Sequence, residues 1–411
     1  MNRFVLLVAS VVIMAVLNSC GGKGGTADAA SDFTAIPGDG VVTLAWTAEP
    51  GVEYWLFYAA GSSVTTSNWS TIGGTAVINV TSPYTITGLK NGSTYSFTMN
   101  GRKGGGPGGA GAPTKVVMPR FAGAKWNTGT ALGTGKLNGI AALAAIDVTV
   151  GSGGTIFAGA NGTIAAARVN PAVPADLNAV TYGGLGFAAV GSAGTIVFST
   201  DGLTWATRTS GSVADLYALA SPGGGSIAAF GAAGTTLFSS GGATWTTATS
   251  ATTQGLFAAT YGGGRYVAVG AGGAIVTSTN GTTWQAVVSN TTSDLRAVSM
   301  GTFVTTTGTG TTAPTTTTTT YVALGAAGTV VTSSDGLTWT ARAPISANTM
   351  NGVAFAGQFV AVGNAGSIYT SADGITWTAQ ISGTTNSLSA IARTSSGYTA
   401  VGAAGTLLTS F

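Results

Sequence analysis

The chain has 411 residues, of which 66 are glycine and only 7% are charged, and its formal net charge is +3. The 15 basic residues are dispersed along the chain, which argues against the dense basic patch of a nucleic-acid surface. Because the sequence contains no histidine, it lacks the commonest general base and the commonest transition-metal ligand. Apolar and aromatic residues recur at strand-like spacing, so the composition favours a packed all-β protein over a disordered one.

Residues 1–19 have the features of a signal peptide. Arg3 precedes the apolar run 4–17, which is too short and wrongly flanked to remain as a membrane span. Cys20, the only cysteine, follows directly in Leu17-Asn18-Ser19-Cys20-Gly21. This junction resembles a bacterial lipoprotein signal, and the resemblance implies cleavage before Cys20 and acylation of its thiol. An ordinary secretory signal followed by a free cysteine is the alternative interpretation.

The lipoprotein resemblance also implies a cellular location. Gly21 and Gly22 are not the aspartate usually associated with inner-membrane retention, so we expect an outer-membrane lipoprotein of the cell envelope, on the periplasmic side or the cell surface. Residues 20–30 are small and polar, and we expect them to form a flexible tether.

Residues 31–119 alternate short apolar runs with Gly, Asn and Pro turns, a pattern that indicates a β-sandwich. The segment resembles a fibronectin type III domain, with Trp46 at the buried second-strand position and Leu89 with Tyr95 at the tyrosine corner. The resemblance implies a spacer or an adhesive module, although the Arg-Gly-Asp tripeptide is absent. The glycine-rich stretch 104–111 is expected to be a floppy loop, with a close-approach surface as the alternative.

From Phe121 onward a G-x-x-G turn recurs at spacings of 40, 40, 39, 55, 38 and 39 residues. Five of these turns are followed, 14 residues after their first glycine, by a tryptophan that closes S-x-D-G-x-T-W or a variant of it. Each repeat holds four short strands. Because a single four-stranded sheet cannot bury both of its faces, the repeats predict radial stacking, with a right-handed β-helix as the alternative.

Seven glycine turns predict a seven-bladed β-propeller over residues 120–411. The last repeat stops at Phe411 before its tryptophan strand, and the stretch 121–126 has the matching pattern, so we expect the N- and C-terminal strands to share one blade and close the ring. The turns resemble shortened Asp-boxes of BNR/sialidase-like propellers, and the repeat is similar to the propeller of photosystem II assembly factors of the Ycf48 type. Structural Asp-box roles are therefore expected for Asp201, Trp205, Asn280, Trp284, Asp335, Trp339, Asp373 and Trp377.

The distribution of acids argues against catalysis. Both glutamates, Glu49 and Glu53, lie in the first domain, whereas sialidases need a glutamate, a tyrosine and an arginine cluster at the central channel. A second recurring motif, D-L-x-A-V/L, contains Asp176, Asp215 and Asp294. These carboxylates either orient the loop that opens each blade or form a partial acidic ring. We expect no catalytic residue, no metal and no cofactor, because Ca²⁺ needs six to eight oxygen ligands and acid–base catalysis needs a placed pair.

Function is expected where the repeats differ from one another. The residues that follow each blade-opening leucine vary, and together with one arginine they are the candidate partner-binding residues: Asn178, Tyr217, Phe257, Arg265, Arg296 and Ser389. The alternative is that half of them point into blade packing. The 55-residue spacing comes from the Thr-rich insertion 305–320, which is either a solvated hairpin extension or an expansion without a task.

The sequence therefore favours a non-enzymatic, monomeric, lipid-anchored envelope protein that acts as a binding or scaffold protein. Its partners would be the membrane, through the lipid, and an unknown protein or glycan, with no nucleic acid. Two alternatives remain: an assembly or stability factor for an envelope complex, as the Ycf48 resemblance implies, and a degenerate glycoside hydrolase.

Overall fold

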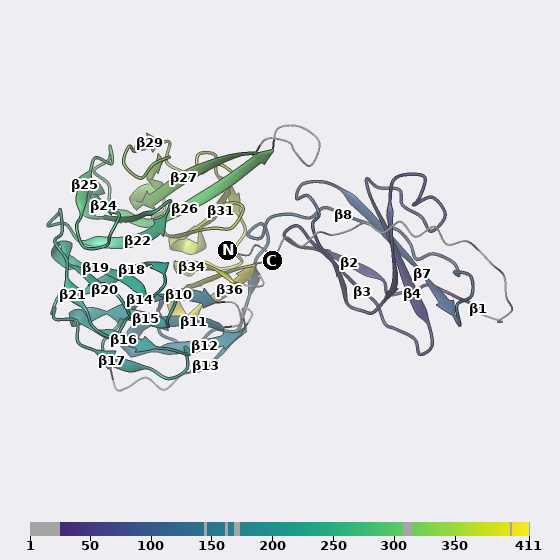
Figure 1. Ribbon diagram of the computed structural model, residues 1–411, viewed down its shortest axis with the longest axis horizontal. Coiled ribbons are helices and arrows are strands. Elements are labelled where there is room, and N and C mark those ends of the chain that lie inside the picture. Colours follow the sequence, from purple (N-terminus) through teal and green to yellow (C-terminus); the bar gives the residue numbers. More distant parts are fainter. Residues whose placement is uncertain are drawn as a thin grey trace, which may run out of the picture. The chain divides into compact units, whose positions relative to one another are not determined.

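The computed structural model describes residues 25–143, 146–160, 163–167, 173–306, 315–394 and 397–410. It divides into two compact units at Arg120 and Phe121, and both are built from β-strands (Figure 1). The expected signal peptide and Cys20 lie outside the described residues, as does part of the Thr-rich insertion. Among the described residues, no helix has the length and apolar character needed to cross a bilayer.

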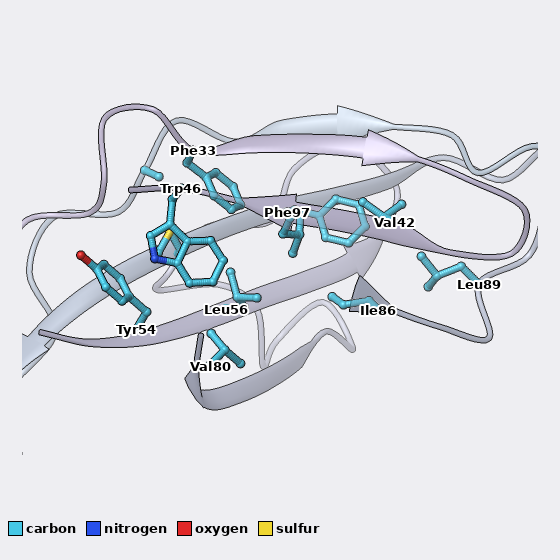
Figure 2. Packing of buried hydrophobic residues seen from close by; sticks show 12 residues of the cluster. Phe33, Val42, Trp46, Tyr54, Leu56, Val80, Ile86, Leu89 and Phe97 are labelled. Atoms are coloured by element: carbon cyan, nitrogen blue, oxygen red, sulfur yellow. The ribbon is translucent and has the colours of Figure 1, made fainter. Parts of the chain in front are cut away.

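The first unit contains two antiparallel sheets. One has the order β1-β7-β4-β5, with β8 also paired to β7, and the other has the order β2-β3-β6. Together they enclose one core, in which Phe33, Trp46, Leu56 and Phe97 are buried (Figure 2). The strands are β1 (Gly25–Ala27), β2 (Thr34–Pro37), β3 (Val42–Ala45), β4 (Glu53–Ala60), β5 (Thr75–Val80), β6 (Tyr84–Ile86), β7 (Tyr95–Lys103) and β8 (Lys115–Val117).

The expected tether 20–30 is too long, because the chain joins the first sheet at Gly25. β1 pairs with the edge of β7, where Gly25 lies opposite Lys103, and Ala27 is buried. β8 covers only the other part of that edge, opposite Tyr95–Phe97. The uncovered part of β7 has backbone N–H and C=O groups that need hydrogen-bond partners. Because Gly25–Ala27 supplies these partners, it forms a strand although its residues have a weak strand preference.

The glycine-rich stretch 104–111 packs closely against the sheet, so the expectation of a floppy loop is wrong. The Gly109 amide donates to the Gly101 carbonyl at 3.0 Å, and the Ala112 amide donates to the Met99 carbonyl at 2.8 Å. A Cβ at Gly108 would collide with the Asn100 side chain. The glycines therefore serve close backbone approach rather than flexibility.

The chain enters the first unit at one end and leaves it at the other. Gly25 lies beside the last residue of β7, whereas Val117 of β8 lies beside its first residue, Tyr95. β7 has 9 residues. At a rise of roughly 3.3 Å per residue, the two ends of the unit are about 26 Å apart.

The described residues of the second unit form seven four-stranded antiparallel sheets. The first strand of each sheet contacts the first strand of the next, and β34 of the last sheet contacts β10 of the first, so the sheets follow one another around a ring. The first three sheets comprise β10 (Leu137–Leu143), β11 (Ile146–Gly151), β12 (Ile156–Ala160) and β13 (Thr163–Ala167); β14 (Leu177–Tyr182), β15 (Phe187–Gly191), β16 (Ile196–Ser199) and β17 (Ala206–Arg208); and β18 (Leu216–Gly223), β19 (Ser226–Gly231), β20 (Thr236–Ser239) and β21 (Thr246–Thr247).

The remaining four sheets continue the same order along the chain. They comprise β22 (Leu256–Gly262), β23 (Arg265–Gly270), β24 (Ile275–Ser278) and β25 (Gln285–Val287); β26 (Leu295–Thr306), β27 (Thr315–Gly325), β28 (Val330–Ser333) and β29 (Thr340–Arg342); β30 (Met350–Phe355), β31 (Phe359–Gly363), β32 (Ile368–Ser371) and β33 (Thr378–Gln380); and β34 (Leu388–Thr394), β35 (Gly397–Gly402) and β36 (Leu407–Ser410), completed by β9 (Asn127–Thr128).

The seventh sheet joins the two ends of the unit. Its outer strand β9 pairs with β36. The sequence predicted this closing strand at 121–126, whereas β9 begins directly afterwards, at Asn127. The Gly123 amide donates to the Ser410 hydroxyl at 2.7 Å, and the Trp126 indole donates to the Gly123 carbonyl at 2.8 Å. One repeated turn is thus assembled from residues at opposite ends of the unit.

A short 3₁₀ turn joins the second and third strands of each sheet and explains the two glycines of G-x-x-G. A Cβ on the first, for example Gly191, would collide with the carbonyl oxygen of Asp176. The last, for example Gly194, has a φ of 69°, a conformation that favours glycine. The turns are Ser152–Gly154, Ser192–Gly194, Ala232–Gly234, Ala271–Gly273, Ala326–Gly328, Asn364–Gly366 and Ala403–Gly405.

The apolar core of the second unit lies between neighbouring sheets. Trp284, which precedes β25 in the fourth sheet, is 7% exposed and packs edge-on against Phe230 of the third sheet, with ring centroids 5.0 Å apart. The repeated tryptophan therefore joins two sheets rather than filling one.

Replacing Trp284 by alanine is expected to lower the free energy of unfolding by about 3–5 kcal/mol, since it opens a cavity between two sheets. Urea denaturation followed by circular dichroism measures this loss. Trp377 is only partly buried, so Trp377→Ala is a matched control with a smaller expected loss. Equal losses in the two variants would contradict the role assigned to Trp284.

Candidate binding site at the mouth of the ring

Seven equivalent residues, one from each sheet, line a cavity of about 470 Å³ at one mouth of the ring. Each stands directly after the residue that opens its sheet's first strand, and we call this set the collar. The register shifts at this position in every sheet, for example between Leu177 and Ala179, so the collar residue occupies a β-bulge. Bulges redirect side chains at the ends of strands. The collar comprises Asn138, Asn178, Tyr217, Phe257, Arg296, Asn351 and Ser389.

Two collar residues, Asn138 and Asn351, were missed in the sequence. The signal was present in Leu137-Asn138-Gly139 and Met350-Asn351-Gly352, where each asparagine follows an apolar residue just as the selected candidates do. Aligning the seven repeats by position, without regard to which residue opens each one, would have found both asparagines.

Arg265 does not line the mouth with the other candidate partner-binding residues, so the prediction that grouped it with them is wrong. It closes the β22–β23 hairpin opposite Gly262, whereas the opening residue Leu256 pairs with Gly270 at the far end of β23. Five residues of strand separate the two ends, or about 16 Å. The Arg265 guanidinium instead donates to the Thr277 hydroxyl at 3.2 Å.

Three collar asparagines connect neighbouring sheets. The side-chain amides of Asn138, Asn178 and Asn351 donate to the carbonyls of Leu177, Leu216 and Leu388, which open the next sheets, at 3.0, 2.9 and 2.8 Å. These side chains are thereby fixed in place while remaining half-buried at the cavity. Of the candidates named from the sequence, Asn178 therefore contributes to the packing between blades, as the alternative interpretation expected for half of them.

On the other side of the collar, three side chains contact one another in a row. The Tyr217 and Phe257 ring centroids are 5.8 Å apart, and the Arg296 guanidinium lies 4.9 Å from the Phe257 centroid. Asp294 holds Arg296 through an ion pair of 3.1 Å. Burial, and then the neighbouring Asp215, raise the pKa of Tyr217, so its phenol stays neutral and able to donate a hydrogen bond.

The collar residues also line a second cavity of about 220 Å³, together with the two residues that follow each of them. The next residue in every sheet is glycine or alanine, and the one after it is aliphatic, as in Ala179 and Val180 or Ala218 and Leu219. The aliphatic side chains of Val180 and Leu219 are buried in the apolar cores between neighbouring sheets.

The D-L-x-A aspartates do not form an acidic ring. Asp176, Asp215 and Asp294 accept hydrogen bonds from backbone amides in the 3₁₀ turn of the preceding sheet, at 2.7, 2.8 and 3.0 Å. They orient the chain that opens each sheet, which was the simpler of the two interpretations.

The repeated S-x-D-G-x-T-W turns use their polar groups internally. Asp335 accepts hydrogen bonds from the amides of Leu337 and Thr338, both at 2.8 Å, and the Trp339 indole donates to the Gly336 carbonyl at 3.3 Å. The same contacts recur around Asp201 with Trp205, Asn280 with Trp284, and Asp373 with Trp377.

These backbone contacts also shift the acidity of the turn carboxylates. The amides of Thr338 and then Leu337 lower the pKa of Asp335 to about 2. The amides of Thr204 and Leu203 lower the pKa of Asp201 in the same way. For Asp373, burial opposes the shift, but hydrogen bonds outweigh it and the pKa is still lowered.

The described residues that line the mouth include no carboxylate and no thiol. Among the described residues of the whole chain, no group of three or more His, Cys, Asp or Glu side chains could hold a metal ion. Asp147 is 2% exposed and lies within β11, away from the residues that line either cavity of the channel. The mouth has the chemistry for hydrogen bonding, stacking and contact with anions.

No protein-family model and no curated protein matches the sequence. Among solved structures, the chain is similar to YCF48 bound to D1 peptide, with 18% identity and a TM-score of 0.54, over 69% of this chain and 94% of that one. YCF48 from Cyanidioschyzon merolae matches at 16% identity and a TM-score of 0.54, over 70% and 99%. The WD40 β-propeller domain of Doa1 matches at 14% and 0.52, over 70% and 97%. At these identities the likeness concerns the fold, and it confirms an all-β chain that contains a β-propeller.

Asp335 is expected to make stability sensitive to acid. Its folded-state pKa is about 2 against an ordinary value of 3.8, so its stabilising contribution is present above about pH 4 and is lost as the pH falls through 2. Asp335→Asn should flatten this part of the pH profile and keep the turn, because Asn280 makes the same contacts with an amide.

Urea unfolding at about pH 5 and about pH 1.5 brackets this window and measures the difference. The reciprocal variant Asn280→Asp serves as the matched control and should add acid sensitivity. If Asp335→Asn leaves the pH dependence unchanged, the assignment to Asp335 is wrong.

Proposed function

We propose that this chain is a non-enzymatic, lipid-anchored protein of the cell envelope that binds a protein or a glycan. Lipid on Cys20 would hold it at the outer membrane, and a fibronectin type III domain over 31–119 would act as a spacer. A seven-bladed propeller over 120–411, closed by its terminal strands, would present the collar as its binding face.

The collar carries this proposal. At seven equivalent bulges the backbone is the same, yet the side chains range from amide through phenol and phenyl to guanidinium. Residues that only build a repeat are expected to repeat, as the aspartates and tryptophans of the turns do. Varied side chains gathered at one concave mouth are typical of a recognition surface.

The first unit has the features of a spacer. Its chain enters and leaves at opposite ends, about 26 Å apart at roughly 3.3 Å per residue. The Tyr95 hydroxyl accepts a hydrogen bond from the Lys90 amide at 3.1 Å, as a tyrosine corner requires. Such a unit would keep the collar clear of the lipid surface.

The chemistry at the mouth supports binding rather than turnover. Acid–base catalysis needs a placed proton donor and acceptor, and glycoside hydrolysis ordinarily uses a pair of carboxylates. The described lining residues supply neither. Turnover of a glycoside by the purified chain would instead favour a degenerate glycoside hydrolase.

An assembly or stability factor for an envelope complex is the second candidate. Two of the similar structures are YCF48, one of them bound to D1 peptide. The likeness in fold makes capture of a segment from a complex subunit a reasonable role for the collar here. Loss of one defined envelope complex in a deletion strain would favour this candidate.

Phe257→Ala combined with Arg296→Gln is expected to abolish capture of the partner, because it removes two of the three collar side chains that contact one another. Loss of about 2 kcal/mol or more of binding free energy is typical of a central aromatic or arginine contact. The measurement is a pull-down from envelope extract and a glycan array, both with the full chain. Tyr369→Ala removes a half-buried ring outside the collar and is the matched control. Unchanged capture by the double variant would contradict the proposal.

Cys20→Ala is expected to release the chain from the membrane fraction, since the acyl chains contribute roughly 0.8 kcal/mol per buried CH₂. Fractionation of cells followed by immunoblotting measures the release. Ser19→Ala keeps both a small residue before the cysteine and the thiol itself, so it should stay in the membrane fraction. Unchanged fractionation of the Cys20 variant would refute lipid anchoring.

A further inference from the structure

Within the part of the chain that the structure describes, the fifth sheet has a feature that the other sheets lack. Its first two strands, β26 and β27, have 12 and 11 residues and are the longest pair of arrows in the unit (Figure 1). Their pairing runs unbroken from Ala297 opposite Leu324 to Thr306 opposite Thr315. The third strand, β28, pairs only with Tyr321–Leu324 of β27. Part of the Thr-rich insertion is therefore a two-stranded extension, which we call the threonine ribbon (302–306 paired with 315–319).

The outer edge of the ribbon lacks a strand partner among the described residues. Alternate residues of an edge strand direct their N–H and C=O groups outward, so Thr315–Thr319 present unpaired backbone groups. Native proteins usually protect such edges with charged residues, proline or a bulge. Thr315–Thr319 contain no charge and no proline, and the register shows no bulge along the ribbon.

The base of the ribbon is fixed to the ring. The Phe303 ring lies 5.0 Å from that of Phe355 and 6.0 Å from that of Phe359, both in the sixth sheet. The Tyr321 hydroxyl donates to the Gly262 carbonyl in the fourth sheet. An isolated two-stranded ribbon is only marginally stable, and these contacts on both sides hold the start of this one in a defined direction.

We propose that the ribbon is a self-association edge, at which Thr315–Thr319 of one chain pair antiparallel with the same residues of a second copy. An uninterrupted threonine run reads the same in both directions, so antiparallel pairing about a twofold axis places threonine opposite threonine at every position. Such cross-strand pairs are favourable, and no charge repels the second copy. The chain would then form a dimer through the ribbon rather than remain a monomer, whatever the collar binds.

Sedimentation equilibrium of the full chain carrying Cys20→Ala, which removes the lipid, tests this pairing. The expected result is a dimer whose fraction rises with protein concentration. Thr317→Lys with Thr319→Lys places charge on the edge and should abolish the dimer. The control is a pair of lysines at Thr282 and Thr376, which lie in exposed loop turns outside the ribbon and should leave the dimer intact. A monomer at every concentration, or a dimer that survives the ribbon lysines, would overturn the proposal.

Disulfide trapping identifies the contact itself. In the Cys20→Ala chain, a single cysteine at Thr317, the position that faces itself across the twofold axis, should form a disulfide-linked dimer under mild oxidation, and one at Thr282 should not. Equal trapping at the two positions would show random collision and overturn the pairing. Retained thermal stability in the lysine variants would separate loss of the dimer from loss of folding.

Discussion

The second unit depends on one close backbone approach that is made seven times. The first glycine of each G-x-x-G turn lies against the carbonyl just before the sheet-opening residue, and the amide that follows the glycine donates to that carbonyl, as Ser192 does to Asp176 at 2.9 Å. This contact fixes the start of each first strand. The next residue is then extra in the ladder and bulges toward the mouth. A single constraint thus produces both the uniform scaffold and the seven positions at which variation is tolerated.

The repeated polar residues are occupied by the scaffold itself. Aspartates of the D-L-x-A motif hold the turn of the preceding sheet, aspartates of the S-x-D-G-x-T-W turn hold their own loop, and the tryptophans join neighbouring sheets. Their groups are therefore not available for chemistry, although a search for carboxylates in the sequence finds them first. The collar is where we propose recognition, and the threonine ribbon lies on another part of the ring.

The repeat period allowed the all-β class, the propeller, the turn glycines and the Asp-box contacts to be predicted, because each reflects a local rule applied many times. Features that depend on partners distant in sequence were not predictable. Gly25–Ala27 joins a sheet only because the edge of β7 is open there, and the glycines of 104–111 pack only because Asn100 lies beneath them. Arg265 was assigned to the wrong end of β23, because the strand pairing that places it opposite Gly262 is not evident from the sequence. Asn138 and Asn351 were overlooked although each follows an apolar residue in the same way as the predicted collar residues.

The central claim is that recognition takes place at the collar. Hydroxyl-radical footprinting of the full chain, alone and with its captured partner, tests it most directly, since Tyr217 and Phe257 are reactive aromatic side chains at the mouth. The account predicts that the partner protects these two rings while Tyr369, outside the collar, stays equally reactive. Protection confined to the S-x-D-G-x-T-W turns or to the first unit would contradict it.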